Sequence, residues 1–307
     1  YFGCRTKDGG FDAEKFKEKA CLSSVKMIEI KLSQGAKPGH GGILPAVKNT
    51  EEIAAIRGVE AHTIVHSPPY HSTFDSPEGL LDFVEKLRSL SGGKPVGFKL
   101  CVGDKEEVRR ICETMVKTGK RPDFITVDGA EGGTGAAPLE FSNHIGMPGQ
   151  EAIAFMNDML RGYDLKKEIK LIYSGKVISG FDIVRALAAG ADLCNSARAM
   201  MFALGCIQSL RCHNNSCPTG VATQNKSLEK ELNVNNKKDR VATFQIETVK
   251  SAVEMFAAMG LENIGAISRK HLHQWSGENN RSMKLEEIFP TVEEGAYLTQ
   301  DKEPLVK

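Results

Sequence analysis

Three cysteines that lie within a dozen residues are the strongest chemical signal in the sequence. Cys206, Cys212 and Cys217 have the spacing C-x5-C-x4-C, and a proline directly follows the last of them. Thiolates are soft ligands that suit iron–sulfur clusters, and this spacing is wider than that of a C-x2-C zinc knuckle. Three thiolates predict a three-iron cluster. Zinc held with His213, a four-iron cluster with Cys194 as fourth ligand, and unrelated free thiols are the alternatives.

A lysine inside an apolar strand is the second signal. Lys99 lies in the apolar run 96–100, and a buried ammonium is costly unless an anion or a hydrogen-bond acceptor meets it. We therefore expect Lys99 to face a bound anion; the alternative is a place at the rim of the sheet. Asp128 ends the following strand in a similar position. Lys31 and Lys37 flank a glycine-rich loop, where they either bind a carboxylate or are ordinary solvated lysines.

Four segments that follow predicted strands are rich in glycine or small polar residues. Glycine lets backbone N–H groups turn toward an anion and tolerates positive φ. The last two segments predict a phosphate site of the kind found at the rim of α/β barrels, although any one of them could be an ordinary tight turn. No segment has the G-x-G-x-x-G arrangement of a dinucleotide site or a Walker A sequence. The segments are residues 34–42, 129–136, 175–176 and 195–198.

The elements that must position these residues alternate between strand and helix. Repeated strand–helix units predict a parallel sheet with crossover helices. We expect strands at 24–31, 61–66, 95–101, 123–128, 169–174 and 191–194, and helices near 12–20, 76–92, 149–161, 180–189 and 240–259, with another from 104. In the strand at 24–31 we expect Met27 to be buried, and in the last helix Val249 and Val253.

Six strands fall short of a closed barrel. The predicted fold is an α/β (β/α)8 TIM barrel whose first two strands precede Tyr1, with an open doubly wound sheet as the alternative. The absence of a starting methionine indicates a longer chain.

Composition excludes several classes of protein. The 307 residues include 40 Lys+Arg and 39 Asp+Glu, so no basic field exists to hold nucleic acid. No apolar run approaches the ~18 residues of a membrane span, and the first residues lack the apolar segment of a signal peptide. Eight cysteines are too few for a disulfide-stapled miniprotein. We expect a cytoplasmic enzyme.

Several motifs occur in the order found in one enzyme family. The sequence contains QGAKPG at 34–39, SPP at 67–69, GGTGA at 132–136, SG at 174–175 and CPTGVATQ at 217–224. Over residues 24–260 the chain resembles the central, FMN-binding region of glutamate synthase, and in particular the stand-alone FMN-binding glutamate synthase family. The resemblance implies a TIM barrel that holds FMN and a [3Fe–4S] cluster.

The resemblance also implies roles for individual residues. Lys99 would lie beside the flavin and stabilise its reduced form, while Lys31, Gln34 and Lys37 would face a dicarboxylate substrate. The three clustered cysteines would bind the iron. The other expected FMN-binding residues are Asp128, Gly132, Gly133, Ser174, Gly175, Lys176, Asn195, Ser196 and Ala197.

The implied reaction is reduction of 2-iminoglutarate, formed from 2-oxoglutarate and ammonia, to L-glutamate with electrons delivered through the cluster. Two residues depart from the family pattern: His40 stands where the family has glutamate, and Asn195 where larger synthases have glycine. The His40 departure allows another amine as substrate, as in N-methylglutamate synthesis. An electron-transfer or scaffold subunit of a larger complex is the other alternative.

The resemblance also implies partners and a division of the chain. No amidotransferase domain or dinucleotide fold is visible, so we expect a separate glutaminase subunit or free ammonia, an electron donor such as ferredoxin or an NAD(P)H-oxidising subunit, and an oligomer. The expected parts are an FMN barrel domain (1–205), an iron–sulfur loop (206–224), a helix that closes the barrel domain (225–265) and a C-terminal docking tail (266–307).

Overall fold

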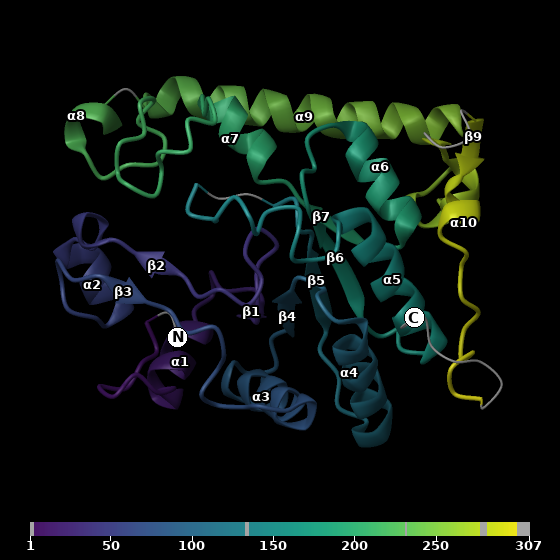
Figure 1. Cartoon of the computed structure of the whole chain (residues 1–307), viewed down its shortest axis with the longest axis horizontal. Helices are drawn as coiled ribbons and strands as arrows, with labels where there is room; N and C mark the ends of the chain where they lie inside the picture. The colour runs from purple at the N-terminus through teal and green to yellow at the C-terminus, as the bar shows by residue number, and fades with distance from the viewer. Residues whose placement is uncertain (1–2, 133–134, 231, 277–280, 300–307) are drawn as a thin grey trace.

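Five parallel strands form the central sheet of this computed structural model, which describes residues 3–132, 135–230, 232–276 and 281–299. The strands follow one another across the sheet in chain order (Figure 1). Successive units of a (β/α)8 barrel have this order, whereas a doubly wound sheet reverses it. The α/β fold with the strand arrangement of part of a barrel is therefore confirmed. The strands are β1 (Ile28–Lys31), β4 (Val96–Leu100), β5 (Phe124–Asp128), β6 (Lys170–Ser174) and β7 (Leu193–Asn195).

Helices alternate with these strands and cover the sheet. In α3 (Pro77–Leu90) the Ser76 hydroxyl accepts the N–H of Gly79, and the proline occupies the first turn, where its missing N–H costs nothing. Leu80, Val84 and Leu87 are buried as predicted. The other covering helices are α4 (Lys105–Thr118), α5 (Gly149–Gly162) and α6 (Gly180–Ala189), and α1 (Ala13–Ala20) precedes β1.

The strand predicted at 61–66 is wrong as part of the central sheet. β3 has two residues (Val65–His66) and pairs antiparallel with β2 (Ile43–Leu44) in a separate ribbon. The side-chain amide of Asn49 donates to the backbone carbonyls of Glu60 and Thr63, and residues 60–64 form a turn before β3 instead of a strand. The 3-10 turn η1 (Ala46–Lys48) and α2 (Glu51–Arg57) lie between these strands. We call residues 43–66 the β2–β3 lobe.

The last long helix, α9 (Val234–Ala258), begins before the predicted position because Asn233 caps it by accepting the N–H of Asn236. It packs along α6 and α7 (Arg198–Leu204), as Figure 1 shows, and the short α8 (Lys226–Glu229) precedes it. The predicted burial of Val249 and Val253 is wrong, since they are 44% and 58% exposed. Met27 is 46% exposed because β1 starts after it.

Residues 264–299 pack against the body of the molecule over their described parts. Arg269 is 3% exposed, and its guanidinium makes two 2.8 Å hydrogen bonds to the carboxylate of Asp158 in α5. Tyr297 packs against the core beside Tyr163. The described parts of this segment therefore pack on α5 and the core. Its elements are η2 (Ile264–Ala266), η3 (Arg269–His271), β8 (His273–Ser276), β9 (Arg281–Lys284) and α10 (Leu285–Ile288).

None of the helices in these described ranges combines the length and the apolar composition needed to cross a membrane.

Candidate functional site

Strand register places five of the predicted site residues on one face of the sheet. Lys31 pairs with Lys99 across β1 and β4. Lys99 pairs with the β5 residue two positions before Asp128, and side chains two apart in a strand share a face. Asp128 pairs with Ser174, which pairs with Asn195. The sheet therefore brings these residues together near the carboxyl ends of its strands.

The predicted lysine inside β4 has a carboxylate partner that sequence reasoning missed. Lys99 Nζ lies 3.9 Å from Glu29 Oε2, and the side chain of Lys99 is 24% exposed. The hydroxyl of the buried Thr126 donates a 2.6 Å hydrogen bond to Glu29 Oε1. Glu29 lies two residues before Lys31 in β1, so strand alternation was the signal that could have identified it.

Three ammonium groups gather at the end of β1 and β4. Burial, followed by the charges of Lys99 and Lys37, lowers the pKa of Lys31 below its usual value. Lys37 is 4% exposed, and its Nζ donates to the carbonyl of Gly41 at 3.3 Å. Lys31 donates to the side-chain oxygen of Gln34. Within the described ranges, no carboxylate forms an ion pair with Lys31 or Lys37, so this cluster is suited to a bound anion.

The first two glycine-rich loops are in contact. Gly35 donates its backbone N–H to Asp128 Oδ2 at 2.9 Å, and a Cβ on Gly35 would lie 1.8 Å from the carbonyl oxygen of Gly129. Gly35 is therefore needed for this close approach. Gly132 lies in the same turn, where a Cβ would be 3.4 Å from Asp128 Oδ1. The predicted Gly133 lies outside the described residues.

The two loops predicted to hold phosphate are also joined. Ser196 donates its hydroxyl hydrogen to the carbonyl of Val177 at 2.8 Å. Lys176 has a φ of 50°, so the turn after β6 places a non-glycine residue in the left-handed region. Tyr173 fixes the base of this turn by donating to the Gly175 carbonyl at 2.9 Å. The accessible side chains of Lys176 and Asn195, with Ala197, lie along this rim.

The cysteine loop (residues 206–224) follows α7. Burial raises the pKa of Cys217, but hydrogen bonds from the Thr219 hydroxyl and from backbone N–H groups outweigh burial and lower the pKa below its usual value. On the Gly135 backbone a Cβ would lie 2.3 Å from Cys212 Sγ, so the second glycine-rich loop touches the cysteine loop. Among the described residues, no three cysteine, histidine or acidic side chains converge as a site for a metal ion. The metal-binding role of Cys206, Cys212 and Cys217 stays a prediction.

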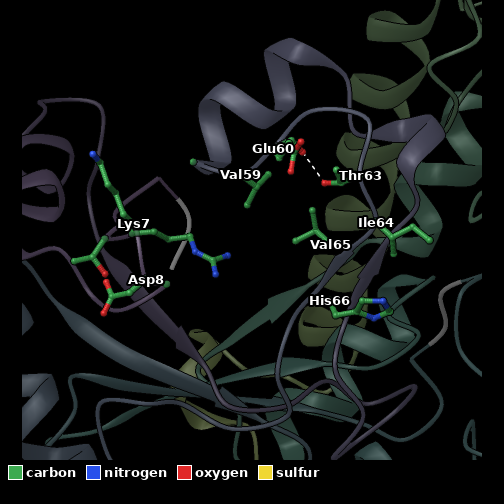
Figure 2. Close-up of a pocket in the computed structure, with 12 residues that line it drawn as sticks. Lys7, Asp8, Val59, Glu60, Thr63, Ile64, Val65 and His66 are labelled. Atoms are coloured by element: carbon green, nitrogen blue, oxygen red, sulfur yellow. Dashed lines mark hydrogen bonds between the residues drawn. The ribbon is translucent and has the colours of Figure 1, made fainter.

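One cavity lies apart from the predicted site. It has a volume of about 560 Å³ and separates the segment at residues 5–9 from the β2–β3 lobe (Figure 2). None of the predicted site residues lines it. Its charged or titratable lining residues are Arg5, Lys7, Asp8, Glu60 and His66.

Comparison with known proteins supports one family. A family model described as the conserved region in glutamate synthase matches residues 2–262. The glutamate synthase large subunit-like protein YerD of Bacillus subtilis is 42% identical over 271 residues, which are 88% of this chain and 51% of that protein. The archaeal glutamate synthase [NADPH] of Methanocaldococcus jannaschii is 36% identical over 80% of this chain and 48% of its own length. The chain thus spans about half the length of these relatives.

Solved structures with a similar arrangement have low sequence identity to this chain. A mandelate oxidase mutant with an FMN adduct has a TM-score of 0.46 and 15% identity, covering 86% of this chain and 59% of that one. DHODH from Eimeria tenella has a TM-score of 0.44 and 12% identity, covering 84% and 58%.

Proposed function

This chain belongs to the glutamate synthase family, and from that premise we propose that it carries the flavin site of an oxidoreductase that forms L-glutamate. The reaction condenses 2-oxoglutarate with ammonia and releases one water. The resulting 2-iminoglutarate then accepts a hydride at its carbon and a proton at its nitrogen. The observation that carries this proposal is the gathering of Lys31, Lys37 and Lys99 at the carboxyl ends of β1 and β4.

The residues at this edge fit FMN. FMN supplies hydride transfer when bound. Lys99 provides a positive charge inside the sheet, where it would meet the negative charge of the reduced flavin. We propose that Asp128 and the 132–133 turn lie along the ring. The residues proposed to hold the phosphate are Ser174, Gly175, Lys176, Asn195, Ser196 and Ala197.

The substrate carboxylates are proposed to bind to the first loop. Lys37 is buried without a carboxylate partner among the described residues, so a substrate carboxylate would neutralise it. Lys31 supplies a second ammonium, and Gln34, which accepts from Lys31, orients that ammonium toward the bound acid. Closely spaced ammonium groups match the two negative charges of 2-oxoglutarate.

We propose that Cys206, Cys212 and Cys217 bind a [3Fe–4S] cluster that delivers the electrons. Three thiols in one loop form a soft donor set, and the N–H groups around Cys217 are of the kind that stabilise cluster sulfurs. A cluster of several irons spreads its ligand sulfurs more widely than one metal ion does. Iron and acid-labile sulfide analysis of anaerobically prepared protein tests this assignment; zinc in their place would reject it.

Partners follow from the same proposal. The chain would receive electrons from ferredoxin or an NAD(P)H-oxidising subunit and ammonia from a glutaminase subunit or from solution. Cytoplasmic location and assembly into an oligomer belong to this proposal too.

A second candidate keeps the cofactors and changes the amine. The exposed His40 in the first loop packs edge-on against Phe141 at 5.6 Å, and it places an imidazole rather than a carboxylate near the lysine cluster. Methylamine is therefore the alternative amine. An electron-transfer or scaffold role is the remaining alternative and predicts a reducible flavin without turnover.

The decisive experiment loads the protein with FMN and supplies a chemical reductant, 2-oxoglutarate and either ammonia or methylamine. We expect a flavin absorption spectrum and glutamate as the product with ammonia, while Lys37→Met keeps the flavin but loses substrate affinity. N-methylglutamate as the main product would favour the second candidate. Failure to bind FMN would reject both.

A further inference from the structure

Lys48 connects the β2–β3 lobe to the cysteine loop. Its Nζ donates to the backbone carbonyl of Cys212 and, at 3.4 Å, to that of Ala222. These two carbonyls lie on either side of Cys217, so a single ammonium holds both arms of the loop. In Figure 1 the loop before α8 lies on the same side of the molecule as β2, α2 and β3.

The backbone next to Lys48 is firmly anchored. Asn49 is fully buried, and its side-chain N–H groups donate to the carbonyls of Glu60 at 2.7 Å and Thr63 at 3.0 Å. The ammonium of Lys48 therefore extends from a fixed base, and an anchored donor loses less entropy when it binds its acceptors.

The charge of Lys48 has no acidic partner in the described ranges. The ion pairs of these residues do not include Lys48, so the two carbonyls are what meets its half-buried ammonium. Hydrogen bonds from a charged donor are about twice as strong as neutral ones. The loop also closes on itself further along, where the Thr223 hydroxyl donates to the carbonyl of Asn215 at 2.7 Å.

The side chain of Cys212 packs closely against the backbone of Gly135. Since a Cβ at Gly135 would lie 2.3 Å from Cys212 Sγ, the sulfur has little room on that side. The backbone of Cys212 is held by Lys48 and its sulfur is bounded by the second glycine-rich loop.

We propose that Lys48 is a positioning residue that fixes the spacing of the cysteine loop by joining its two arms to the β2–β3 lobe. The proposal deepens the proposed function of the loop, since correctly spaced thiols are needed for a cluster. The spacing itself does not depend on iron, so Lys48 can be tested in iron-free protein.

The test compares alkylation rates of individual cysteines in reduced, iron-free protein by peptide mass spectrometry. In Lys48→Met we expect Cys212 and Cys217 to react about tenfold faster with iodoacetamide than in the wild type, the factor that corresponds to 1.4 kcal/mol. The exposed and distant Cys21 should react at an unchanged rate. Lys48→Arg, which keeps a charged donor, should restore slow alkylation.

The matched control is Lys26→Met, which removes an exposed lysine that precedes β1. It should leave all three rates unchanged. Equal rates at Cys212 and Cys217 in Lys48→Met and the wild type would overturn the proposal. If the wild type binds no iron but Lys48→Met still loosens the loop, the cluster assignment fails and the Lys48 assignment stands.

A second measurement needs no variant. In the wild type, an amine-reactive reagent should label Lys48 at least about tenfold more slowly than Lys26, because the Lys48 ammonium is held by two carbonyls. Equal labelling would overturn the proposal even where Lys48→Met fails to fold.

Discussion

At the scale of single residues, the site is defined by an imbalance of charge. Three lysines share the end of β1 and β4, whereas Glu29 is paired with one of them, Lys99, and is held by the hydroxyl of Thr126. Clustered like charges raise the energy of the folded protein unless an anion joins them. This group of lysines is therefore suited to bind an anion.

Removal of the Lys99 charge tests its proposed place beside the flavin. Lys99→Met should lower turnover by about 10–100-fold, since a hydrogen bond from a charged group contributes about 1.5–3 kcal/mol, and should shift the flavin potential to more negative values. Stopped-flow kinetics and a spectroelectrochemical titration measure both effects. Lys117→Met, at a 77% exposed side chain, is the control. An unchanged potential in Lys99→Met would place the flavin elsewhere.

Lys31 should give 2-oxoglutarate binding an unusual dependence on pH. Because its pKa is lowered, Lys31 loses its charge at a lower pH than the ~10.4 of an ordinary lysine. Above that lowered pKa the apparent Kd should rise by up to about tenfold per pH unit. Calorimetric titration should show this break in the wild type and not in Lys31→Met. The same break in both proteins would assign it to another group.

The lowered pKa also has a consequence for folding. In the unfolded chain Lys31 keeps its proton up to its ordinary pKa, so between the two values the unfolded state binds more protons. The free energy of unfolding contributed by this group should therefore rise with pH in that window.

At the scale of elements, the first two glycine-rich loops pack backbone against backbone. Gly35→Ala would place a methyl group against the Gly129 carbonyl, so we expect a loss of about 1–3 kcal/mol in the free energy of unfolding together with weaker FMN binding. Urea unfolding and fluorescence titration measure the two effects. Gly103→Ala, where no atom lies within 4 Å of the added Cβ, should change stability by less than about 0.5 kcal/mol. Similar values for the two variants would contradict the close approach.

The buried ion pair between η3 and α5 should be a strong determinant of stability. Arg269→Met leaves Asp158 buried without its cation, and we expect a loss of about 3–5 kcal/mol by chemical denaturation. The double variant Arg269→Met/Asp158→Leu should regain much of it, because both charges are then gone. Lys226→Met, which breaks an ion pair with an 85% exposed lysine, should leave the denaturation midpoint close to that of the wild type. A double variant no more stable than Arg269→Met alone would contradict this account.

The sequence was most informative where local signals agreed. The ends of α3 were predicted within a few residues because Ser76 caps it, and α5 and the strands from β4 to β7 because apolar runs mark them. Prediction failed where distant contacts decide the structure. The turn at residues 60–63 is held by the side chain of Asn49. Helix α9 has apolar side chains on two sides, so its period could not tell which side is buried. Arg269 gave no local signal at all, since its partner Asp158 is 111 residues away.

Within the site, the position of a residue along its strand decides whether the sequence reveals it. Five predicted residues lie together because each ends, or nearly ends, a strand of a parallel sheet, and the strand register puts them on one face. They are Lys31, Lys99, Asp128, Ser174 and Asn195. Glu29 and Thr126 were missed because a polar residue earlier in a strand looks like any solvent-facing residue. Lys48 lies in a short turn, and its two contacts are 164 and 174 residues away in sequence.

At the scale of the whole molecule, the described sheet has β1 and β7 as its two edge strands. Leu193 in β7 is 56% exposed. An edge strand with an apolar side chain is a template for pairing with another chain. We therefore expect the β7 edge to take part in self-association.

Leu193→Lys should therefore lower self-association of the isolated chain. A charge on an edge strand opposes strand-to-strand pairing, so light scattering at rising concentration should show less aggregate than in the wild type. Leu22→Lys changes an equally accessible leucine, 54% exposed, in the turn after α1. If both variants reduce scattering equally, general solubility rather than edge pairing is the cause.

The order of the strands also bears on how the protein is made. From β5 to β7 each strand lies beside the one synthesised just before it, so a growing chain can extend its sheet one unit at a time as it leaves the ribosome. Arg269 emerges after all five strands, and its guanidinium then forms two hydrogen bonds with Asp158 in α5. Translation that stops short of this arginine would release a chain that has all five strands but lacks the buried ion pair with Asp158.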